Sequence, residues 1–116
     1  MKKANAITYK RTAAGDLLGE NEAMRMQEKL LKYYCDVNEI EIIGTYQDSS
    51  YGGNFDRPAF IELLKFCEDN KGAANLLLIT SWDRFSRDPL NAQLMIKRLS
   101  DLGIEVKAVK QPNSLL

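Results

Sequence analysis

Apolar residues recur along this chain with two different spacings, one typical of β-strands and one typical of α-helices. Four short runs, at 4–9, 40–46, 75–80 and 104–109, are apolar or alternate between apolar and polar residues, so we expect a strand at each. The run NLLLIT at 75–80 is the most continuously apolar, which is typical of a parallel strand covered on both faces. It is the best candidate for a central strand.

Signals for helix ends appear in the intervals between these strands. Asp56 is a suitable N-cap ahead of Pro58, which fits the first turn of a helix. Asp88 and Pro89 open another helix in the same way, and Gly103 closes it. The segment QDSSYGGNFDRP ahead of the first of these helices breaks both spacings with glycines and a proline, and predicts a mobile loop.

Helical spacing also predicts which faces of three helices turn toward the core. In a first helix over 20–37, the expected inner positions are Ala23, Met26, Leu30, Tyr34 and Val37. In the second helix they are Phe60, Leu63, Leu64 and Cys67. In the third they include Leu90, Leu94, Met95, Leu99 and Leu102. Strands and helices alternate along 116 residues, which predicts one α/β domain over 1–116, a three-layer, mostly parallel sheet with flanking helices.

Charged and polar side chains follow three of the expected strands at their carboxyl ends, where ligands bind in open α/β sheets. They are Tyr9 and Arg11 after the first strand, Asp48 and Arg57 after the second, and Asp83, Arg84 and Arg87 after the third. Four of the six arginines lie here, and a guanidinium offers a planar set of donors that fits phosphate oxygens. Converging arginines predict a site for a phosphate or a phosphoryl transition state. The alternative is that each arginine pairs with a neighbouring aspartate at the surface.

Three further features have both a structural and a functional interpretation. Gln27 lies among the apolar positions of the first helix, so it is either an inner residue that reaches the site or a polar residue at the edge of the apolar face. Gly52 and Gly53 could hold phosphate, although adjacent glycines more often form a flexible turn. Trp82 is expected to pack, although an aromatic ring beside an arginine could also touch DNA.

Composition narrows the function classes without identifying one. The chain has 16 basic and 16 acidic residues, which argues against a polybasic nucleic-acid arm. Cys35 and Cys67 lack CxxC spacing and there is no histidine, so no zinc site is expected, and we read both cysteines as buried thiols of a cytoplasmic protein. The chain opens without a charged and apolar leader and its apolar runs are too short to span a bilayer, so no membrane association is expected.

The strand-end residues, taken in order, resemble the N-terminal catalytic domain of the serine recombinases, the resolvase and invertase family. The resemblance covers nearly the whole chain. It rests on the Y-x-R at Tyr9 and Arg11, on Gln27, on the D-x-x-x-G-x-x-x-D-R-P segment from Asp48 to Pro58, and on the D-R-x-S-R-D segment from Asp83 to Asp88. A single Y-x-R means nothing, but these motifs together at family-like spacing are a specific signal.

The resemblance implies site-specific recombination of double-stranded DNA. In this family a serine hydroxyl attacks a backbone phosphodiester, which leaves a 5′-phosphoserine bond and a free 3′-OH before the strands are exchanged and rejoined. Neither a metal nor another cofactor is implied, because arginines stabilise the charge that develops at phosphorus. The residues implied to hold the phosphate and activate the nucleophile are Arg11, Arg57, Arg84 and Arg87. The residues implied to support them are Asp83, which orients the arginines, Gln27, Asp48, and Tyr9, which shapes the floor.

The sequence departs from the family pattern at the nucleophile. The pattern is Y-x-R-x-S, and Ala13 stands at the serine position, so the resemblance implies a chain that does not cleave DNA. Ala13 is either a Ser→Ala change in an otherwise intact site or the native residue of a degenerate family member. Thr12 is a poor substitute, because successive residues of an extended segment point to opposite sides. The other hydroxyls considered, without support from the pattern, belong to Ser49, Ser50, Ser81 and Ser86.

Two further differences from the family concern a loop and the end of the chain. Tyr51 stands where many members have a serine, which bears on hydrogen bonding by that loop. The family's catalytic domain continues past VKQPNS into another strand, a long dimerisation helix and a DNA-binding domain. We therefore expect an N-terminal fragment of a recombinase that forms homodimers and tetramers, and weak DNA binding by the fragment alone. The alternatives are a non-catalytic DNA-binding or regulatory relative and a flavodoxin-like domain that binds a phosphate ligand.

Overall fold

Four parallel strands form one sheet in the computed structural model, which describes residues 4–50 and 53–110. The strands are β1 (Ala4–Thr12), β2 (Ile40–Ser49), β3 (Leu76–Ile79) and β4 (Glu105–Ala108). The helices are α1 (Glu20–Val37), α2 (Pro58–Asp69), α3 (Trp82–Phe85) and α4 (Pro89–Asp101). The strand order is β2-β1-β3-β4 and every neighbouring pair is parallel, which confirms the predicted α/β fold and the central position of β3.

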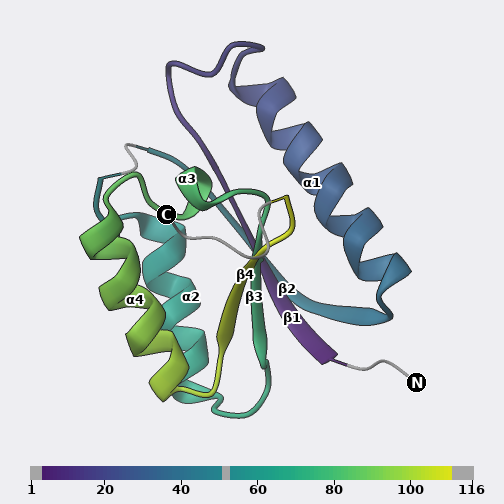
Figure 1. Cartoon of the computed structure of the whole chain (residues 1–116), viewed down its shortest axis with the longest axis vertical. Helices are drawn as coiled ribbons and strands as arrows, with labels where there is room; N and C mark the ends of the chain where they lie inside the picture. Colours follow the sequence, from purple (N-terminus) through teal and green to yellow (C-terminus); the bar gives the residue numbers. More distant parts are fainter. Residues whose placement is uncertain (1–3, 51–52, 111–116) are drawn as a thin grey trace.

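The helices divide between the two faces of the sheet. Figure 1 shows α1 over one face, and α2 with α4 over the other. The chain passes from β1 through α1 to β2 at one edge, and from β3 through α4 to β4 at the opposite edge. The strand order therefore changes direction between β1 and β3. In open α/β sheets this is where the carboxyl ends of two strands leave a crevice for a ligand.

The larger part of the core lies between the sheet and the layer formed by α2 and α4. Ile7 and Leu77 of the sheet form one cluster with Phe60 and Leu63 of α2 and Leu99 of α4, and none of the five is more than 1% exposed. Burial of each such side chain contributes roughly 1.5–3 kcal/mol. The predicted inner face of α2 is confirmed, because its buried residues are Phe60, Leu63, Leu64 and Cys67.

α1 has the predicted boundaries, but its buried face matches the predicted one only in part. Met26 and Val37, which were predicted to face inward, are 55% and 60% exposed. The buried residues are Ala23, Gln27, Leu31 and Cys35. The prediction is confirmed for Ala23 and wrong for Met26 and Val37, because α1 carries two adjacent rows of apolar residues and the row that faces the sheet includes a polar residue. The amide of Gln27 is accommodated there because it bonds to the backbone of β1.

β1 and β2 both extend beyond their predicted ends, and this extension carries polar residues into the site. Their pairing shifts register once, between Ala6 and Ile7, where β2 contains one extra residue. Beyond this bulge, Arg11 of β1 lies opposite Asp48 of β2. The alternating pattern of the sequence did not reveal the bulge, which sets the register of every later residue pair between these two strands.

The two predicted N-caps have different outcomes. Asp88 caps α4 as predicted, since its carboxylate accepts hydrogen bonds from the backbone N–H groups of Leu90 and Asn91. At α2 the cap residue is Arg57 instead of the predicted Asp56, and its side chain makes no capping bond. The first N–H groups of α2 instead donate to the carboxylate of Asp48, a residue of β2.

The segment after β3 also differs from the prediction. The short helix α3 was not predicted, because four residues are too few to show a helical period. Leu90 and Leu94 of α4 are 65% and 61% exposed, although they were predicted to face the core. The buried residues of α4 are Ala92, Met95 and Leu99. Within the described ranges, no helix is long and apolar enough to cross a membrane.

Candidate functional site at the strand ends

β1 carries Tyr9 and Arg11 into the crevice. These residues are two apart, so they project from the same face of the strand, and both are 0% exposed. Lys10 lies between them and projects to the other face, where its ammonium group pairs with Glu28 of α1 at 2.7 Å. The end of β1 therefore holds adjacent buried cations on opposite faces, and within the part of the chain that the structure describes only Lys10 has a carboxylate partner.

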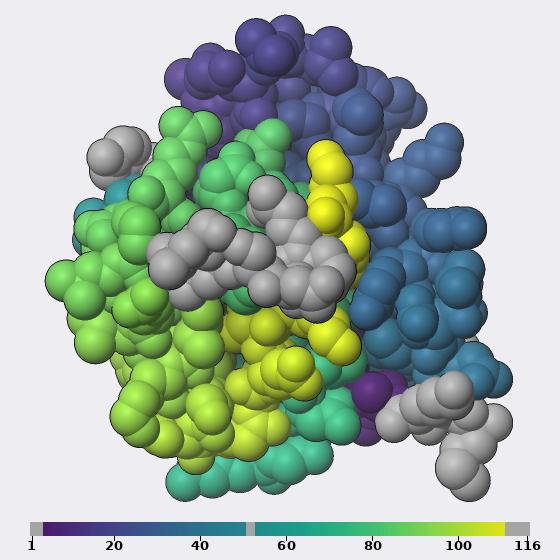
Figure 2. Space-filling model, viewed as in Figure 1, coloured from purple at the N-terminus to yellow at the C-terminus, as the bar shows by residue number. Residues whose placement is uncertain are grey.

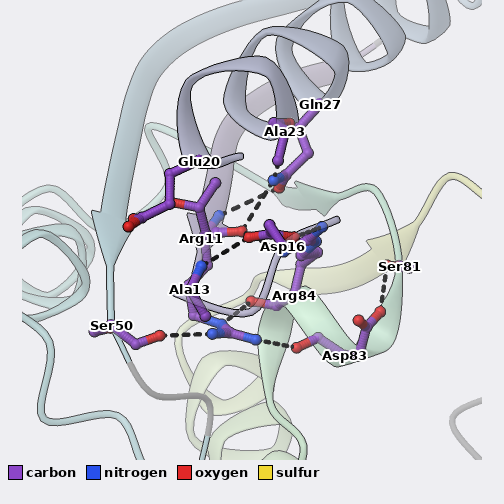
Figure 3. A network of polar contacts seen from close by, with 11 residues as sticks. Arg11, Ala13, Asp16, Glu20, Ala23, Gln27, Ser50, Ser81, Asp83 and Arg84 are labelled. Carbon is purple, nitrogen blue, oxygen red and sulfur yellow. Dashed lines mark hydrogen bonds and ion pairs between the residues drawn. The ribbon is translucent and has the colours of Figure 1, made fainter. Parts of the chain in front are cut away.

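Backbone carbonyl groups hold the guanidinium of Arg11. Its Nε donates to the carbonyl of Arg84 at 3.2 Å, Nη1 to that of Ser50 at 2.6 Å, and Nη2 to that of Asp83 at 2.7 Å. Figure 3 shows this cation between the end of β2 and the α3 segment. No carboxylate contacts it in the described part of the chain. The carbonyl groups orient the charge but do not neutralise it, which is the electrostatic situation that favours an incoming anion.

Other arginines increase the positive charge around Arg11. Burial is the main cause that lowers the pKa of Arg11, and the nearby charges of Arg57, Arg87 and Arg84 lower it further, in that order. Like charges gathered at a buried position destabilise one another unless an anion lies among them. The other three strand-end arginines predicted from the sequence therefore all lie near enough to Arg11 for their charges to act on it, although the four differ in exposure.

Arg57 is buried against aromatic rings. Its guanidinium carbon lies 4.6 Å from the ring centre of Phe55 and 5.9 Å from that of Tyr9, both within the range of cation–π contacts. Its Nε donates to the carbonyl of Asn54 at 2.9 Å. This side chain is 0% exposed, so a phosphate would reach it only at the inner end of the site.

Asp48 joins the floor of the site to the start of α2. Its carboxylate accepts a hydrogen bond from the Tyr9 hydroxyl at 2.8 Å, and others from the backbone N–H groups of Ala59 and Phe60 at 2.9 and 3.0 Å. It thus supplies the N-terminal capping that α2 does not receive from Arg57. The Tyr9 hydroxyl also accepts a hydrogen bond from Arg57 at 3.5 Å. Burial is the main cause that raises the pKa of Tyr9, so the phenol stays protonated and continues to donate to Asp48.

Gln27 binds the backbone of Arg11 with both ends of its amide. Its Oε1 accepts a hydrogen bond from the Arg11 N–H at 3.2 Å, and its Nε2 donates to the Arg11 carbonyl at 2.9 Å. Gln27 is 5% exposed, which settles the two alternatives in favour of an inner residue. The amide of Gln27 thus satisfies both backbone hydrogen-bonding groups of Arg11, as a neighbouring strand would, and holds α1 against the end of β1.

Ala13 lies in a tight turn that Asp16 stabilises. One carboxylate oxygen of Asp16 accepts a hydrogen bond from the Ala13 N–H at 2.8 Å, and the Asp16 N–H donates to the Ala13 carbonyl at 3.1 Å. The other carboxylate oxygen pairs with Nη2 of Arg84 at 2.6 Å, and Arg84 also donates to the carbonyl of Arg11 at 3.1 Å. The hydrogen bond from Arg84 is the main cause that lowers the pKa of Asp16. Asp16 could not be predicted as a site residue from the sequence, because its partner is 68 residues away.

Asp83 and Arg87 lie differently from the other predicted site residues. The carboxylate of Asp83 accepts a hydrogen bond from the Ser81 hydroxyl at 2.5 Å, and only its backbone carbonyl meets Arg11. Arg87 is exposed and makes no hydrogen bond or ion pair with the described residues. Among the strand-end arginines, Arg84 pairs with the carboxylate of Asp16, whereas Arg11 contacts no carboxylate among the described residues. The surface pairing that was the alternative to a phosphate site therefore does not describe Arg11.

The hydroxyl groups near Ala13 are mostly engaged elsewhere. Those of Thr12 and Ser49 both donate to the Glu20 carboxylate at the start of α1, the first at 3.2 Å. The Ser81 hydroxyl bonds Asp83, and the Ser86 hydroxyl donates to the carbonyl of Asp88 at 3.2 Å. The remaining hydroxyl, Oγ of Ser50, is buried and has no hydrogen-bond partner among residues 4–50 and 53–110. Glu20, like Asp16, was not predicted as a site residue from the sequence.

A cleft of about 810 Å³ opens beside the site, between the turn at 13–19, α1 and the α3 segment. Asp16, Gln27 and Arg84 line it together with the apolar side chains of Leu17 and Met26. Figure 2 shows the turn and the start of α1 (purple to blue) projecting at one end of the molecule above the α3 segment (green). Solvent and a ligand can therefore reach Arg84 from this side.

The loop between β2 and α2 is tied to α4. The Asn91 side chain donates to the carbonyl of Gly53 at 2.6 Å. The predictions for Tyr51 and Gly52 lie outside the described residues.

Trp82 packs at the edge of the main core cluster, with its ring 6.1 Å from that of Phe85, so the packing role expected for it is confirmed. In the described ranges, no group of three or more acidic, cysteine or histidine side chains is placed to hold a metal ion.

Comparison with known proteins identifies the family of this fold and site. The family model described as "Resolvase, N terminal domain" matches residues 6–115. The N-terminal catalytic domain of TP901-1 integrase is similar in structure, with a TM-score of 0.81, 21% identity, and coverage of 93% of this chain and 78% of that one. A resolvase family site-specific recombinase from Streptococcus pneumoniae matches with a TM-score of 0.81 and 20% identity, covering 95% and 74%.

A third similar structure is the C-terminal catalytic domain of ISC1926 TnpA, an IS607-like serine recombinase, with a TM-score of 0.79 and 23% identity. It covers 90% of this chain and 70% of that one. The comparison with curated protein sequences finds no match. The structural neighbours are below 25% identity and show the fold, whereas the family model spans nearly the whole sequence. This chain therefore belongs to the resolvase N-terminal domain family, as its strand-end residues suggested.

Proposed function

We propose that this chain is the catalytic domain of a cytoplasmic site-specific DNA recombinase whose phosphate site is assembled but lacks its nucleophile. The observation that carries the proposal is the environment of Arg11. Its guanidinium is fully buried, held only by carbonyl groups in the described structure, and surrounded by three further arginines. A DNA phosphodiester is an anion that would compensate this charge at the strand ends.

The family membership supplies the expected reaction. A serine hydroxyl at position 13 would attack phosphorus to form a phosphoserine bond to the 5′ side of the break. The bond from phosphorus to the 3′ oxygen would break, and the proton of the serine would pass to that oxygen. Arginines would stabilise the additional charge on the phosphoryl oxygens during both cleavage and its reversal. Ala13 has no oxygen, so we expect the chain as it stands to hold a phosphate without cutting it.

The position or the contacts of each residue at the strand ends support the role proposed for it. Arg11 and Arg84 would bind the phosphate at the carboxyl ends of β1 and β3, with exposed Arg87 at the entrance and buried Arg57 at the floor. Asp83 would position Arg11 through its backbone carbonyl. The residues that would support this arrangement without touching DNA are Tyr9, Gln27 and Asp48. We expect the recombinase to act on double-stranded DNA as a homodimer or tetramer, in which two such sites meet two strands.

A second candidate is a non-catalytic relative that binds DNA or regulates a partner recombinase. Ala13 itself favours it, and so does the ion pair that already engages Arg84. The two candidates differ in one respect: restoring a hydroxyl at position 13 restores chemistry in the first and changes nothing in the second.

The test is Ala13→Ser in the full-length protein, mixed with end-labelled duplex oligonucleotides of randomised sequence. We expect a DNA adduct that survives denaturing electrophoresis with Ala13→Ser, and none with the unchanged chain. Ala14→Ser is the matched control, because it places the same hydroxyl one residue along in the exposed turn and should give no adduct. Binding of the oligonucleotides without any adduct from Ala13→Ser would favour the non-catalytic relative. A tight flavin or nucleotide complex without DNA binding would favour the flavodoxin-like alternative.

A further inference from the structure

Asp16 connects the position of the missing nucleophile to an arginine of the phosphate site. One of its carboxylate oxygens holds the Ala13 N–H at 2.8 Å, and the other holds Nη2 of Arg84 at 2.6 Å. The side chains of Asp16 and Arg84 are only 10% and 18% exposed, so water screens this pair less than a surface pair. A single carboxylate therefore joins two parts of the site that come from β1 and from α3.

The same contacts place the carboxylate where an external anion would bind. Arg84 lines the open cleft, and its two terminal nitrogens already donate to Asp16 and to the carbonyl of Arg11. A phosphate that binds Arg84 at the Nη2 hydrogen that Asp16 now accepts has to displace this carboxylate, although the guanidinium has further N–H donors. The carboxylate is itself an anion, so it repels the phosphate as well as competing with it.

We propose that Asp16 is a positioning residue that occupies the phosphate-binding face of Arg84 in the free protein and gives it up to DNA. When a backbone phosphate binds the guanidinium of Arg84, the ion pair between Arg84 and Asp16 breaks. The turn that contains position 13 is then no longer bonded to α3 through Asp16. Phosphate binding and the placement of position 13 are thereby linked through one side chain. This inference rests on the proposed function, because it assumes that a DNA phosphate is the anion that binds here.

The first experiment measures the affinity of the protein for a duplex of about 20 base pairs across a range of salt concentrations, with and without Asp16→Asn. Asparagine keeps an oxygen for the Ala13 N–H but removes the charge that holds Arg84. We expect several-fold tighter binding by Asp16→Asn with an unchanged slope of log K against log [salt], because the same phosphate contact to Arg84 forms in both proteins but no longer has to displace a carboxylate.

Two comparisons separate this effect from a general loss of negative charge. Glu22→Gln also removes a carboxylate paired with an arginine, Arg25, but on the exposed side of α1, and it should leave the affinity for the duplex nearly unchanged. In an Arg84→Gln background, adding Asp16→Asn should also leave the affinity nearly unchanged, because the released guanidinium is absent. An unchanged affinity for Asp16→Asn alone, with normal DNA binding, would overturn the role of Asp16 but leave the proposed function standing.

A second measurement uses the unchanged chain and so does not depend on a variant that folds. Inorganic phosphate is titrated while the backbone amide of Ala13 and the guanidinium signals of Arg84 are followed by NMR. We expect both sets of signals to shift along the same saturation curve, because phosphate frees the carboxylate that holds the amide. A shift at Arg84 without one at Ala13 would overturn the linkage. No response to phosphate or to DNA would count against both the linkage and the phosphate site itself.

Discussion

Arg11 is the residue on which the site depends most, because its charge is buried and no described carboxylate compensates it. Sequence reasoning could identify Arg11 from its place after a strand, but not its partners, since backbone carbonyls leave no mark in a sequence. Gln27 was identified for the opposite reason, as a polar residue among apolar positions. Asp16 and Glu20 were missed because each is an ordinary charged residue until the fold brings its partner near.

At the scale of a residue, Asp16 gives a pH-dependent contribution to stability. Its pKa is lowered in the folded protein, chiefly by the hydrogen bond from Arg84, so this contribution is present above the pKa of an unfolded aspartate and is lost as the pH falls through the folded value. Asp16→Asn should lower the free energy of unfolding at pH 7 by about 1–3 kcal/mol, as for other hydrogen bonds to charged groups. Urea unfolding at a series of pH values measures the difference.

The difference between the two proteins should shrink below about pH 4, where the unfolded carboxylate takes up its proton, and should be smallest once the folded carboxylate is also protonated. A difference that stays constant down to strongly acidic pH would show that the charge of Asp16 contributes nothing to stability.

At the scale of the element, the sequence identified all the strands and the three longer helices but not how they are held. Apolar spacing located α1 to the residue and identified Ala23 as an inner position, but it also turned Met26 and Val37 inward, because their apolar row has the same period as the buried one. The start of α2 looked capped by Asp56 because local spacing favours it. The structure instead uses Asp48, which belongs to β2. Local patterns cannot show a cap that arrives from a distant strand.

The two candidate caps of α2 can be compared directly. Asp48→Ala removes the acceptor for two backbone N–H groups and for the Tyr9 hydroxyl, so it should lower the free energy of unfolding by about 1–3 kcal/mol. Asp56→Ala should change it by less than about 0.5 kcal/mol, since Asp56 is exposed and its side chain does not cap the helix. Chemical denaturation of both variants measures this. Equal losses, or a larger loss for Asp56→Ala, would contradict the cap seen here.

At the scale of the whole molecule, the order β2-β1-β3-β4 explains why residues from three distant segments form one site. The change of direction between β1 and β3 leaves their carboxyl ends side by side, and the parallel pairing of β1 with β2 adds Asp48 and the loop that follows it. The alternation of strands and helices predicted a parallel sheet, and the strand-end rule predicted which residues would meet. The strand order and the bulge could not be predicted, because both depend on pairings between residues far apart in the sequence.

The central claim is that position 13 is the nucleophile position of an otherwise assembled phosphate site. The most direct measurement is mass spectrometry of the Ala13→Ser protein after reaction with duplex DNA, digestion by nuclease and protease, and location of the remaining nucleotide. The account predicts a nucleotide joined through its 5′-phosphate to Ser at position 13. A nucleotide on Ser49, Ser50, Ser81 or Ser86 instead, or on none of the peptides although the protein binds DNA, would contradict it.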